Sequence, residues 1–257
     1  MEYLQWSHED KVATIQISSP PANALSSKLI QELSEVFDSI ETDDEIRVVL
    51  LHGEGRFFSA GADIKEFTET ESGEGFTKLA KHGQNVFERI ESFPKPVIAA
   101  IHGAALGGGL ELAMACHFRL VTEGAKLGLP ELSLGLIPGF GGTQRLPRYV
   151  GPARAAEMML TSKPITGLEA VQFGLANHAY KDEELLEKAK TMAKEIAKKS
   201  PIVLKAVIKL LNCAKTEEFA QGVKKEAKLF GKVSQSIDSK EGISAFLEKR
   251  EPTFSGK

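Results

Sequence analysis

Hydrophobic and polar positions in the first 180 residues follow two alternating periods. Four short apolar segments predict strands that are largely buried, at residues 12–17, 46–51, 97–101 and 118–121. Between them, apolar side chains recur at helical spacing, at residues 29–40, 79–90 and 110–116. Strands that alternate with amphipathic helices predict an α/β fold.

The pattern changes after about residue 180, where only helical spacing remains. Proline suits a first helical turn, so Ser200-Pro201 is expected to end one helix and begin another. Side chains of the N-capping type precede the predicted helices at Ser26, Asp182, Thr216 and Asp238. We therefore predict a core over residues 1–190 and an all-helical region over residues 191–257. The apolar side of that region must be buried against its own core or against a neighbouring subunit.

Composition narrows the classes of protein to consider. A chain of 257 residues fits one large domain, or a core with a smaller appendage. A formal net charge of -3 does not suggest a nucleic-acid-binding protein, which usually carries a strongly basic face. The two cysteines are far apart and form no CxxC pair, which favours buried thiols in a reducing compartment.

We also expect a cytoplasmic protein with no membrane partner. The first residues contain no basic stretch followed by an apolar one, as a signal peptide would. The longest apolar run, residues 97–101, is far too short to span a bilayer.

Three consecutive glycines, residues 107–109, lead from a buried strand into a helix. Glycine inside a helix costs about 1 kcal/mol relative to alanine, so its use here suggests that something approaches the backbone closely. A helix N-terminus offers free N–H groups and the positive end of a dipole, which can hold an anion or a developing negative charge. Close packing of helix on strand explains the glycines equally well.

Two glutamates stand in apolar surroundings next to glycine-rich backbone. Glu111 lies on the helix of residues 110–116, and Glu131 lies between apolar residues before the structured turn of residues 135–142. A buried carboxylate is costly unless it is paired or functional. Glu111 facing solvent or meeting Arg119, and Glu131 lying in water, are the simpler explanations for each glutamate alone. Together they are better candidates for acid–base chemistry, in which one group gives a proton and another takes one.

Other catalytic signatures are missing from the sequence. No GxGxxG follows a strand, and no GxxxxGK[ST] or GxSxG occurs. The six histidines show no HExxH spacing, so we expect no metal.

Four segments, residues 59–65, 105–111, 130–131 and 137–146, resemble the crotonase family, specifically its enoyl-CoA hydratases. The separation of Glu111 and Glu131, 131 − 111 = 20, is that of the hydratases, and the similarity runs from near residue 10 to Arg250. The resemblance implies a crotonase-like spiral of repeated ββα units with an all-helical C-terminal region. It further implies C-terminal helices that trimerise, giving a homotrimer or a homohexamer built as a dimer of trimers.

The resemblance also implies the site and its reaction. The backbone N–H groups of Ala62 and Gly108 would form an oxyanion hole for the thioester oxygen. Glu111 would act mainly as base and Glu131 mainly as acid, with roles that can be shared. Water would add to a trans-2-enoyl-CoA and give a 3-hydroxyacyl-CoA, a hydro-lyase reaction of fatty-acid (β-oxidation) or branched-acid degradation. Coenzyme A is part of the substrate, so no separate cofactor is expected.

Substrate contacts are expected from the residues that flank the oxyanion hole: Ala60, Ala62, Asp63, Ile64, Lys65, Gly108 and Phe140. Lys65 and Arg56 are candidates to meet the polyanionic coenzyme. Phe140 stands where many relatives carry a small residue, so we expect it to reshape the acyl pocket. Residues 66–78 are polar and contain glycine, and we expect them to be mobile and to border the acyl tail.

Three other activities fit parts of this sequence. An isomerase of the same family commonly keeps one acidic residue, whereas both Glu111 and Glu131 are present. A hydratase for a branched substrate such as methylglutaconyl-CoA is compatible with every motif. RNA binding, known for one branch of the family, is disfavoured because the region after Asp63 is acidic and lacks spaced lysines.

Overall fold

Two β-sheets and eleven α-helices make up the described part of the chain. The computed structural model describes residues 1–68 and 72–257. The strands are β1 (Leu4–Glu9), β2 (Val12–Ile17), β3 (Val48–Gly53), β4 (Val97–Ile101), β5 (Ala104–Leu106), β6 (Phe118–Thr122), β7 (Lys126–Gly128), β8 (Ile165–Thr166) and β9 (His178–Tyr180). The helices are α1 (Ser27–Thr42), α2 (Ile64–Thr68), α3 (Gly73–Glu91), α4 (Gly108–Ala115), the 3₁₀ turn η1 (Glu131–Leu134), α5 (Gly142–Val150), α6 (Pro152–Thr161), α7 (Gly167–Gln172), α8 (Leu185–Ala197), α9 (Pro201–Thr216), α10 (Phe219–Val233) and α11 (Ile237–Glu248).

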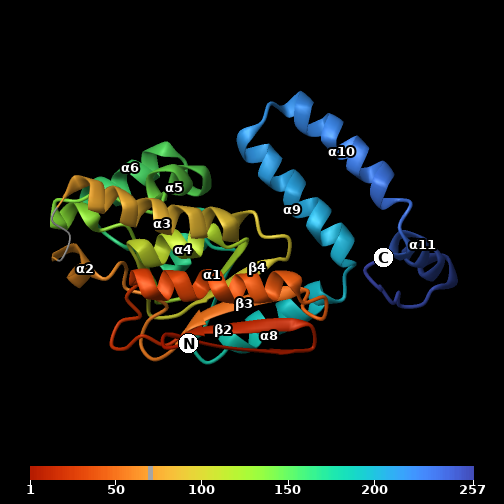
Figure 1. The fold of residues 1–257 in the computed structure, drawn as a ribbon, viewed down its shortest axis with the longest axis horizontal. Helices are drawn as coiled ribbons and strands as arrows, with labels where there is room; N and C mark the ends of the chain where they lie inside the picture. Colours follow the sequence, from red (N-terminus) through yellow and green to blue (C-terminus); the bar gives the residue numbers. More distant parts are fainter. Residues whose placement is uncertain (69–71) are drawn as a thin grey trace.

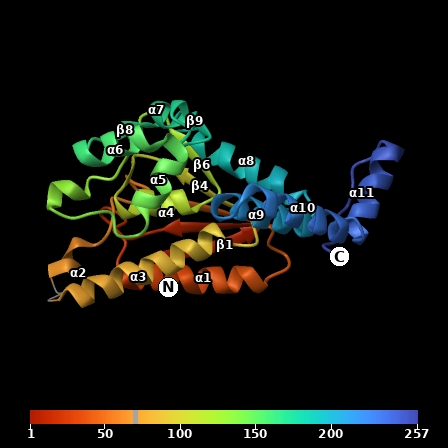
Figure 2. The ribbon, with the colours of Figure 1, turned by 90° about the horizontal axis from the view of Figure 1, so that it is seen from above.

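The larger sheet has six strands in the order β1-β2-β3-β4-β6-β9. Only β1 and β2 pair antiparallel, and the other neighbours pair parallel. Parallel strands need crossover connections, so helices cover both faces. Helix α8 covers one face of the sheet, and α1, α3 and α4 cover the other (Figures 1 and 2); each set shares a hydrophobic core with its face. The smaller sheet, β5-β7-β8, lies at the point where α4 begins.

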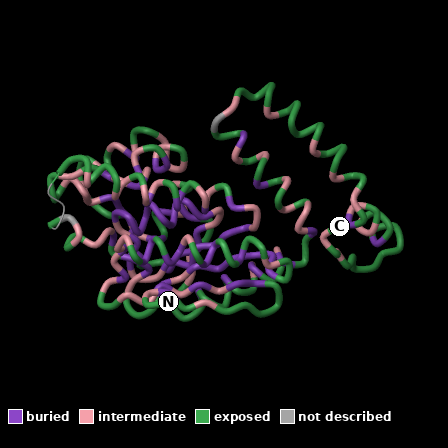
Figure 3. Tube along the Cα trace, in the orientation of Figure 1, coloured by how far each residue is buried: buried purple, intermediate pink, exposed green. Residues whose placement is uncertain are grey.

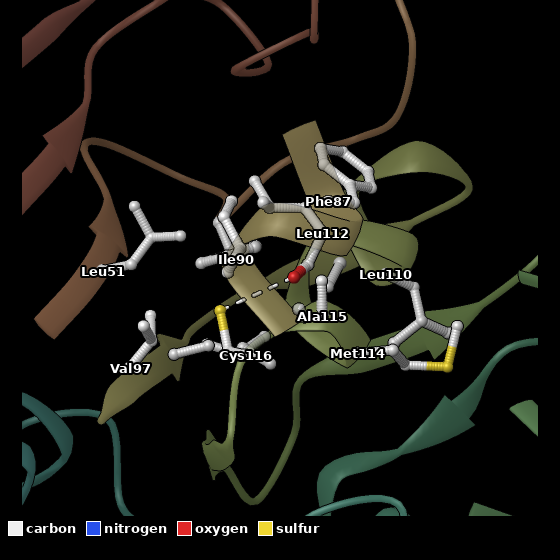
Figure 4. Packing of buried hydrophobic residues seen from close by; sticks show 14 of the residues in the cluster. Leu51, Phe87, Ile90, Val97, Leu110, Leu112, Met114, Ala115 and Cys116 are labelled. Carbon is white, nitrogen blue, oxygen red and sulfur yellow. Dashed lines mark hydrogen bonds between the residues drawn. The ribbon is translucent and has the colours of Figure 1, made fainter. Parts of the chain in front are cut away.

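Helix α4 lies entirely inside the core. All eight of its residues are buried. Leu110, Leu112 and Met114 of α4 lie in the same core as Phe87 and Ile90 of α3 (Figure 4). Packing on every side fixes the axis of α4 and therefore the position of its N-terminal turn.

Several sequence predictions are confirmed by the structure. The strands of residues 12–17 and 97–101 have the predicted bounds, whereas that of residues 46–51 begins two residues later. Ser26 caps α1, since its side chain accepts the N–H of Leu29, and Pro201 opens α9. The α/β class and the helical C-terminal region are also confirmed.

Three predicted caps are wrong. Helix α8 begins after Glu184 rather than Asp182, and Thr216 is the last residue of α9. Ser236 caps α11, because its hydroxyl lies close enough to accept the N–H of Ser239. The carboxylate of Asp238 is buried and instead accepts the Ser200 hydroxyl and the N–H of Ser255. Asp238 therefore holds the C-terminal tail to the start of α9, a long-range role that a local capping rule does not detect.

Helices α9, α10 and α11 extend away from the sheets as an arm (Figure 1). Most of the arm is exposed or half-buried (Figure 3), including the large apolar side chains Leu211, Phe219, Phe230, Ile243 and Phe246. The predicted boundary between residues 190 and 191 falls inside α8, which packs on the sheet. No helix in the described ranges is both long and apolar enough to cross a membrane.

Candidate active site

A cavity of about 470 Å³ opens between the N-terminus of α4, helices α2 and α3, and the turn η1. Its walls are mostly apolar, with contributions from Ile64, Phe76, Leu79, Leu136, Ile137 and Phe140. Glu111 and Glu131 both line it, together with Ala62, Gly107 and Gly108. The two glutamates that the sequence singles out, 20 residues apart, therefore share one mostly apolar pocket.

Two backbone N–H groups meet at the wall formed by α4. Gly108 is the first residue of α4, so its N–H lies outside the helix's own hydrogen bonds. The nitrogen of Ala62 lies 3.3 Å from the position that a Cβ on Gly108 would take. Within residues 1–68 and 72–257, neither N–H donates to an acceptor. This pair can bind an oxygen that carries negative charge, aided by the dipole of α4.

Glycine at position 107 makes room for a carboxylate. Its φ of 49° is in the left-handed region, and a Cβ there would stand 3.1 Å from Glu131 Oε1. A side chain at this position would thus be strained and would also displace Glu131. The sequence suggested two explanations for the glycine run: close approach of another group to the backbone, and close packing of the helix. Each explanation applies at a different glycine. Gly109 packs on Ser59, where a Cβ would lie only 2.4 Å from the Ser59 carbonyl oxygen.

Glu111 is held by backbone donors from a distant loop. The residue is 1% exposed, and its Oε1 accepts the N–H of Phe140 at 2.8 Å and of Gly142 at 2.7 Å. Burial raises the pKa of Glu111 to about 7; the N–H of Gly142 opposes this rise and the neighbouring charge of Glu131 adds to it. A carboxyl with a pKa near 7 can serve as a base or an acid at neutral pH.

Glu131 opens the turn η1, which follows β7. Burial raises the pKa of Glu131, and the backbone N–H of Glu131 itself opposes the rise. Its Oε2 is buried and has no hydrogen-bond partner in the described part of the chain. An unsatisfied buried carboxyl oxygen is costly and points to a role with a bound molecule.

The loop of residues 139–142 was predicted only as a structured turn. Besides the two donors to Glu111, it provides the carbonyl of Gly139, which accepts Gln84 Nε2 at 2.8 Å. The carbonyl of Phe140 accepts Nη1 of Arg145 at 2.7 Å. The sequence assigned no role to Gln84, which lies in no motif, or to Arg145, which lies within the segment of residues 137–146. Their contacts with the loop depend on how the chain folds.

The other predicted substrate contacts divide into two groups. Ala60, Ala62, Ile64, Gly108 and Phe140 line the cavity. Asp63 and Lys65 do not line it; Asp63 Oδ1 instead accepts the N–H of Lys65, which fixes the first turn of α2.

Arg56 is exposed and lies with its guanidinium 4.8 Å from the ring centroid of Phe57. In the segment 66–78, residues 69–71 lie outside the described residues, residues 73–78 are helical, and Phe76 and Thr77 line the cavity.

The simpler explanation for Glu111, a pair with Arg119, is wrong. Arg119 donates to the carbonyls of Cys116 and Leu175 and lies over the ring of Tyr149. It therefore neutralises the C-terminal end of α4, at the opposite end from the N-terminal turn that carries Glu111. No group of three His, Cys, Asp or Glu side chains in the described residues is arranged to hold a metal ion.

Comparisons with known proteins identify the family of the chain. A sequence model described as enoyl-CoA hydratase/isomerase matches residues 7–257. The chain is 58% identical over 247 residues to a probable enoyl-CoA hydratase of Bacillus subtilis, covering 96% of each. It is 41% identical to a short-chain-enoyl-CoA hydratase of Clostridium acetobutylicum, covering 94% of this chain and 93% of the relative. A solved enoyl-CoA hydratase structure from Bacillus anthracis matches with a TM-score of 0.95 at 37% identity, covering 99% of this chain and 100% of that one.

Proposed function

The chain belongs to the enoyl-CoA hydratase/isomerase family, has the crotonase fold and is a hydro-lyase, and from this premise we propose how its site adds water to a trans-2-enoyl-CoA. One observation carries the proposal. Two carboxyls with raised pKa, Glu111 and Glu131, line the same cavity as the N–H groups of Ala62 and Gly108, which donate to no acceptor among the described residues.

The thioester oxygen binds between the N–H groups of Ala62 and Gly108. Attack at C3 moves electron density onto this oxygen, and the two donors stabilise the resulting enolate-like charge. A donor of this kind typically contributes about 2.7–4 kcal/mol to the transition state. The apolar walls exclude competing water, which strengthens both hydrogen bonds.

Glu111 and Glu131 hold one water molecule between them. The backbone donors bind Glu111 Oε1, so Oε2 is the atom that takes the proton as the water oxygen bonds to C3. Glu131, protonated at its unpartnered Oε2, delivers a proton to C2. The sum is addition of H and OH, and transfer between the carboxyls and solvent restores both groups. Because the carboxyls are neighbours, their titration belongs to the pair.

The coenzyme extends from the cavity along residues 62–65. Lys65 and Arg56 are exposed next to this loop and meet the phosphate groups by charge attraction. Phe140 is 8% exposed and narrows the cavity beside Gly108, which favours short acyl chains.

The arm of α9–α11 assembles the chain into a trimer, and two trimers form a hexamer. Exposed apolar side chains on all three helices support this, among them Leu211, Phe230, Ile243 and Phe246. Large contiguous apolar patches are rare on proteins that stay monomeric, so we expect these side chains to be covered in the assembly. The expected readout is a molar mass of three or six chains by light scattering.

A hydration assay tests the activity. The purified protein is given straight-chain 2-enoyl-CoA esters of increasing length and a branched methylglutaconyl-CoA, and loss of conjugated thioester absorbance is followed. A 3-enoyl-CoA is tested separately, because its double bond is not conjugated to the thioester and isomerisation would appear as a gain of that absorbance. We expect hydration of short 2-enoyl esters, and loss of at least about 100-fold in kcat for Glu111→Gln and for Glu131→Gln. Glu88→Gln, an exposed change on α3, is the matched control. Preference for the branched ester, or turnover of the 3-enoyl ester that survives Glu131→Gln, would replace the proposed substrate or reaction.

A further inference from the structure

Arg145 of α5 links the loop of residues 139–142 to an anchor outside the cavity. Its side chain is 7% exposed, with Nη1 on the Phe140 carbonyl at 2.7 Å and Nε on Glu91 Oε2 at 2.9 Å. Glu91, the last residue of α3, also accepts Lys215 Nζ of α9 on Oε1 at 2.9 Å. A chain of contacts thus runs from α9 through Glu91 and Arg145 to the loop.

The Phe140 carbonyl occupies a special place in that loop. It lies between the two N–H groups that hold Glu111, those of Phe140 and Gly142. A shift of this carbonyl would turn one or both donors away from Glu111. Three of the four loop residues are glycine, so the loop has little stiffness of its own.

Glycine at position 141 gives the guanidinium access to the loop. Its φ is 98°, and a Cβ there would stand 2.6 Å from Arg145 Nη1. The backbone conformation therefore requires glycine, and a Cβ at this position would also displace the guanidinium from where it meets the loop. The planar fork of arginine lets one side chain serve two acceptors in fixed directions, which a lysine does not reproduce.

We propose that Arg145, anchored by Glu91, is a positioning residue that sets the orientation of the base Glu111 by clamping the carbonyl between its two backbone donors. This inference rests on the proposed function, since it assigns a role relative to Glu111. A buried ion pair by itself is weak evidence for a stabilising role, because desolvation offsets its attraction. The contact of Arg145 with the loop that holds Glu111 distinguishes the Arg145–Glu91 pair from one that only links α3, α5 and α9.

The test compares Arg145→Met with Arg148→Met. Arg148 is on the same helix, is 47% exposed and lies 4.0 Å from Glu91, so it is a matched control without a contact to the loop. We expect Arg145→Met to lower kcat about 10- to 100-fold, as small misplacements of catalytic groups do, with a smaller change in KM. Arg148→Met should keep the kcat of the unaltered protein.

The pH profile separates positioning from a merely structural role. The charged groups that act on Glu111 are Glu131 of η1 and Arg145 of α5. Loss of the Arg145 charge should move the acid limb of kcat to higher pH, because a positive neighbour favours the ionised base. Arg145→Lys keeps the positive charge but not the planar guanidinium. The acid limb of its kcat profile should therefore stay at the pH of the unaltered protein, while kcat itself should recover only in part.

The outcomes distinguish this inference from the proposed function. If the unaltered protein does not hydrate any enoyl-CoA, the proposed function fails. If it does, and Glu111→Gln is inactive, then a folded Arg145→Met with unchanged kcat and pH profile overturns the positioning role alone. Should Arg145→Met not fold, Glu91→Gln removes the anchor's charge and keeps its shape; lowered kcat at similar KM supports the role, and unchanged kcat overturns it.

Discussion

Replacing the buried base should stabilise the protein at alkaline pH while it abolishes activity. Burial raises the pKa of Glu111 from its ordinary 4.5 to about 7, so above pH 7 the folded chain carries a carboxylate with little access to water. Glu111→Gln has the same shape and keeps an oxygen that accepts the N–H groups of Phe140 and Gly142. The variant has no charge to bury.

The sign follows from proton linkage. The folded state binds the Glu111 proton more tightly than the unfolded chain does, so protonation stabilises the fold. This contribution is fully present below pH 4.5 and is lost as the pH rises through 7. Between pH 5 and pH 8 the loss is about 2.5 kcal/mol for the unaltered protein and absent from the variant.

Thermal unfolding measures this difference. For a chain of this size, 1 kcal/mol corresponds to about 2–4 °C in Tm, so the variant's Tm relative to the unaltered protein should rise by roughly 5–10 °C from pH 5 to pH 8. Protein concentration is held constant, because assembly also affects Tm. A Tm difference that is the same at both pH values would refute the assignment of Glu111 as a buried carboxyl with raised pKa.

Glu91→Gln is a control of opposite sign. Burial alone would raise the pKa of Glu91, but hydrogen bonds and charge from Lys215 and Arg145 outweigh it and lower the pKa. A lowered pKa stabilises the fold above the ordinary value of 4.5, and this stability is lost as the pH falls through the folded-state pKa. Glu91→Gln should therefore lower Tm at pH 8 and lower it less at acid pH.

Three further substitutions test the loop beside Glu111, the acyl pocket and the subunit interface. Gly142→Ala places a Cβ 2.9 Å from Glu111 Oε1 and should lower kcat about tenfold, as small misplacements do, with an unchanged circular dichroism spectrum; an unchanged kcat would contradict the tight fit. Phe140→Ala should shift the ratio of kcat/KM toward longer acyl chains and destabilise the fold by about 3–5 kcal/mol, measured by urea unfolding; unaltered chain-length preference would remove Phe140 from the acyl pocket. Phe246→Glu puts a charge on an apolar side chain that is 83% exposed in one chain and should reduce the molar mass measured by light scattering; an unchanged mass would place this residue outside the interface.

The sequence predicted most of what local pattern determines. Short apolar segments located β2 and β4. The cap at Ser26 could be predicted because its hydroxyl accepts a hydrogen bond from Leu29, only three residues away. Strand β1 was missed because the polar residues among Leu4–Glu9 weaken its alternation. Asp238 was misassigned because its partners, Ser200 and the C-terminal tail, lie far away in the chain.

The same distinction between local and long-range features applies to the residues of the candidate site. Glu111, Glu131 and Gly108 stand out as costly residues in apolar or helical settings, so their types alone raise the question of function. The donors to Glu111 are backbone N–H groups, which every residue except proline carries. The residue types in the sequence therefore cannot identify them. Arg145 and Gln84 act on that loop through single contacts, which only the folded chain reveals.

The most direct test of the central claim is a crystal structure with a bound unreactive acyl-CoA that mimics the enoyl thioester. We expect the thioester oxygen at about 2.7–3.1 Å from both the Ala62 and Gly108 nitrogens. The acyl C2 and C3 should lie next to Glu131 and Glu111, with one water or its equivalent between the carboxyls. A thioester oxygen bound elsewhere, or either carboxyl turned away from the acyl chain, would contradict the central claim.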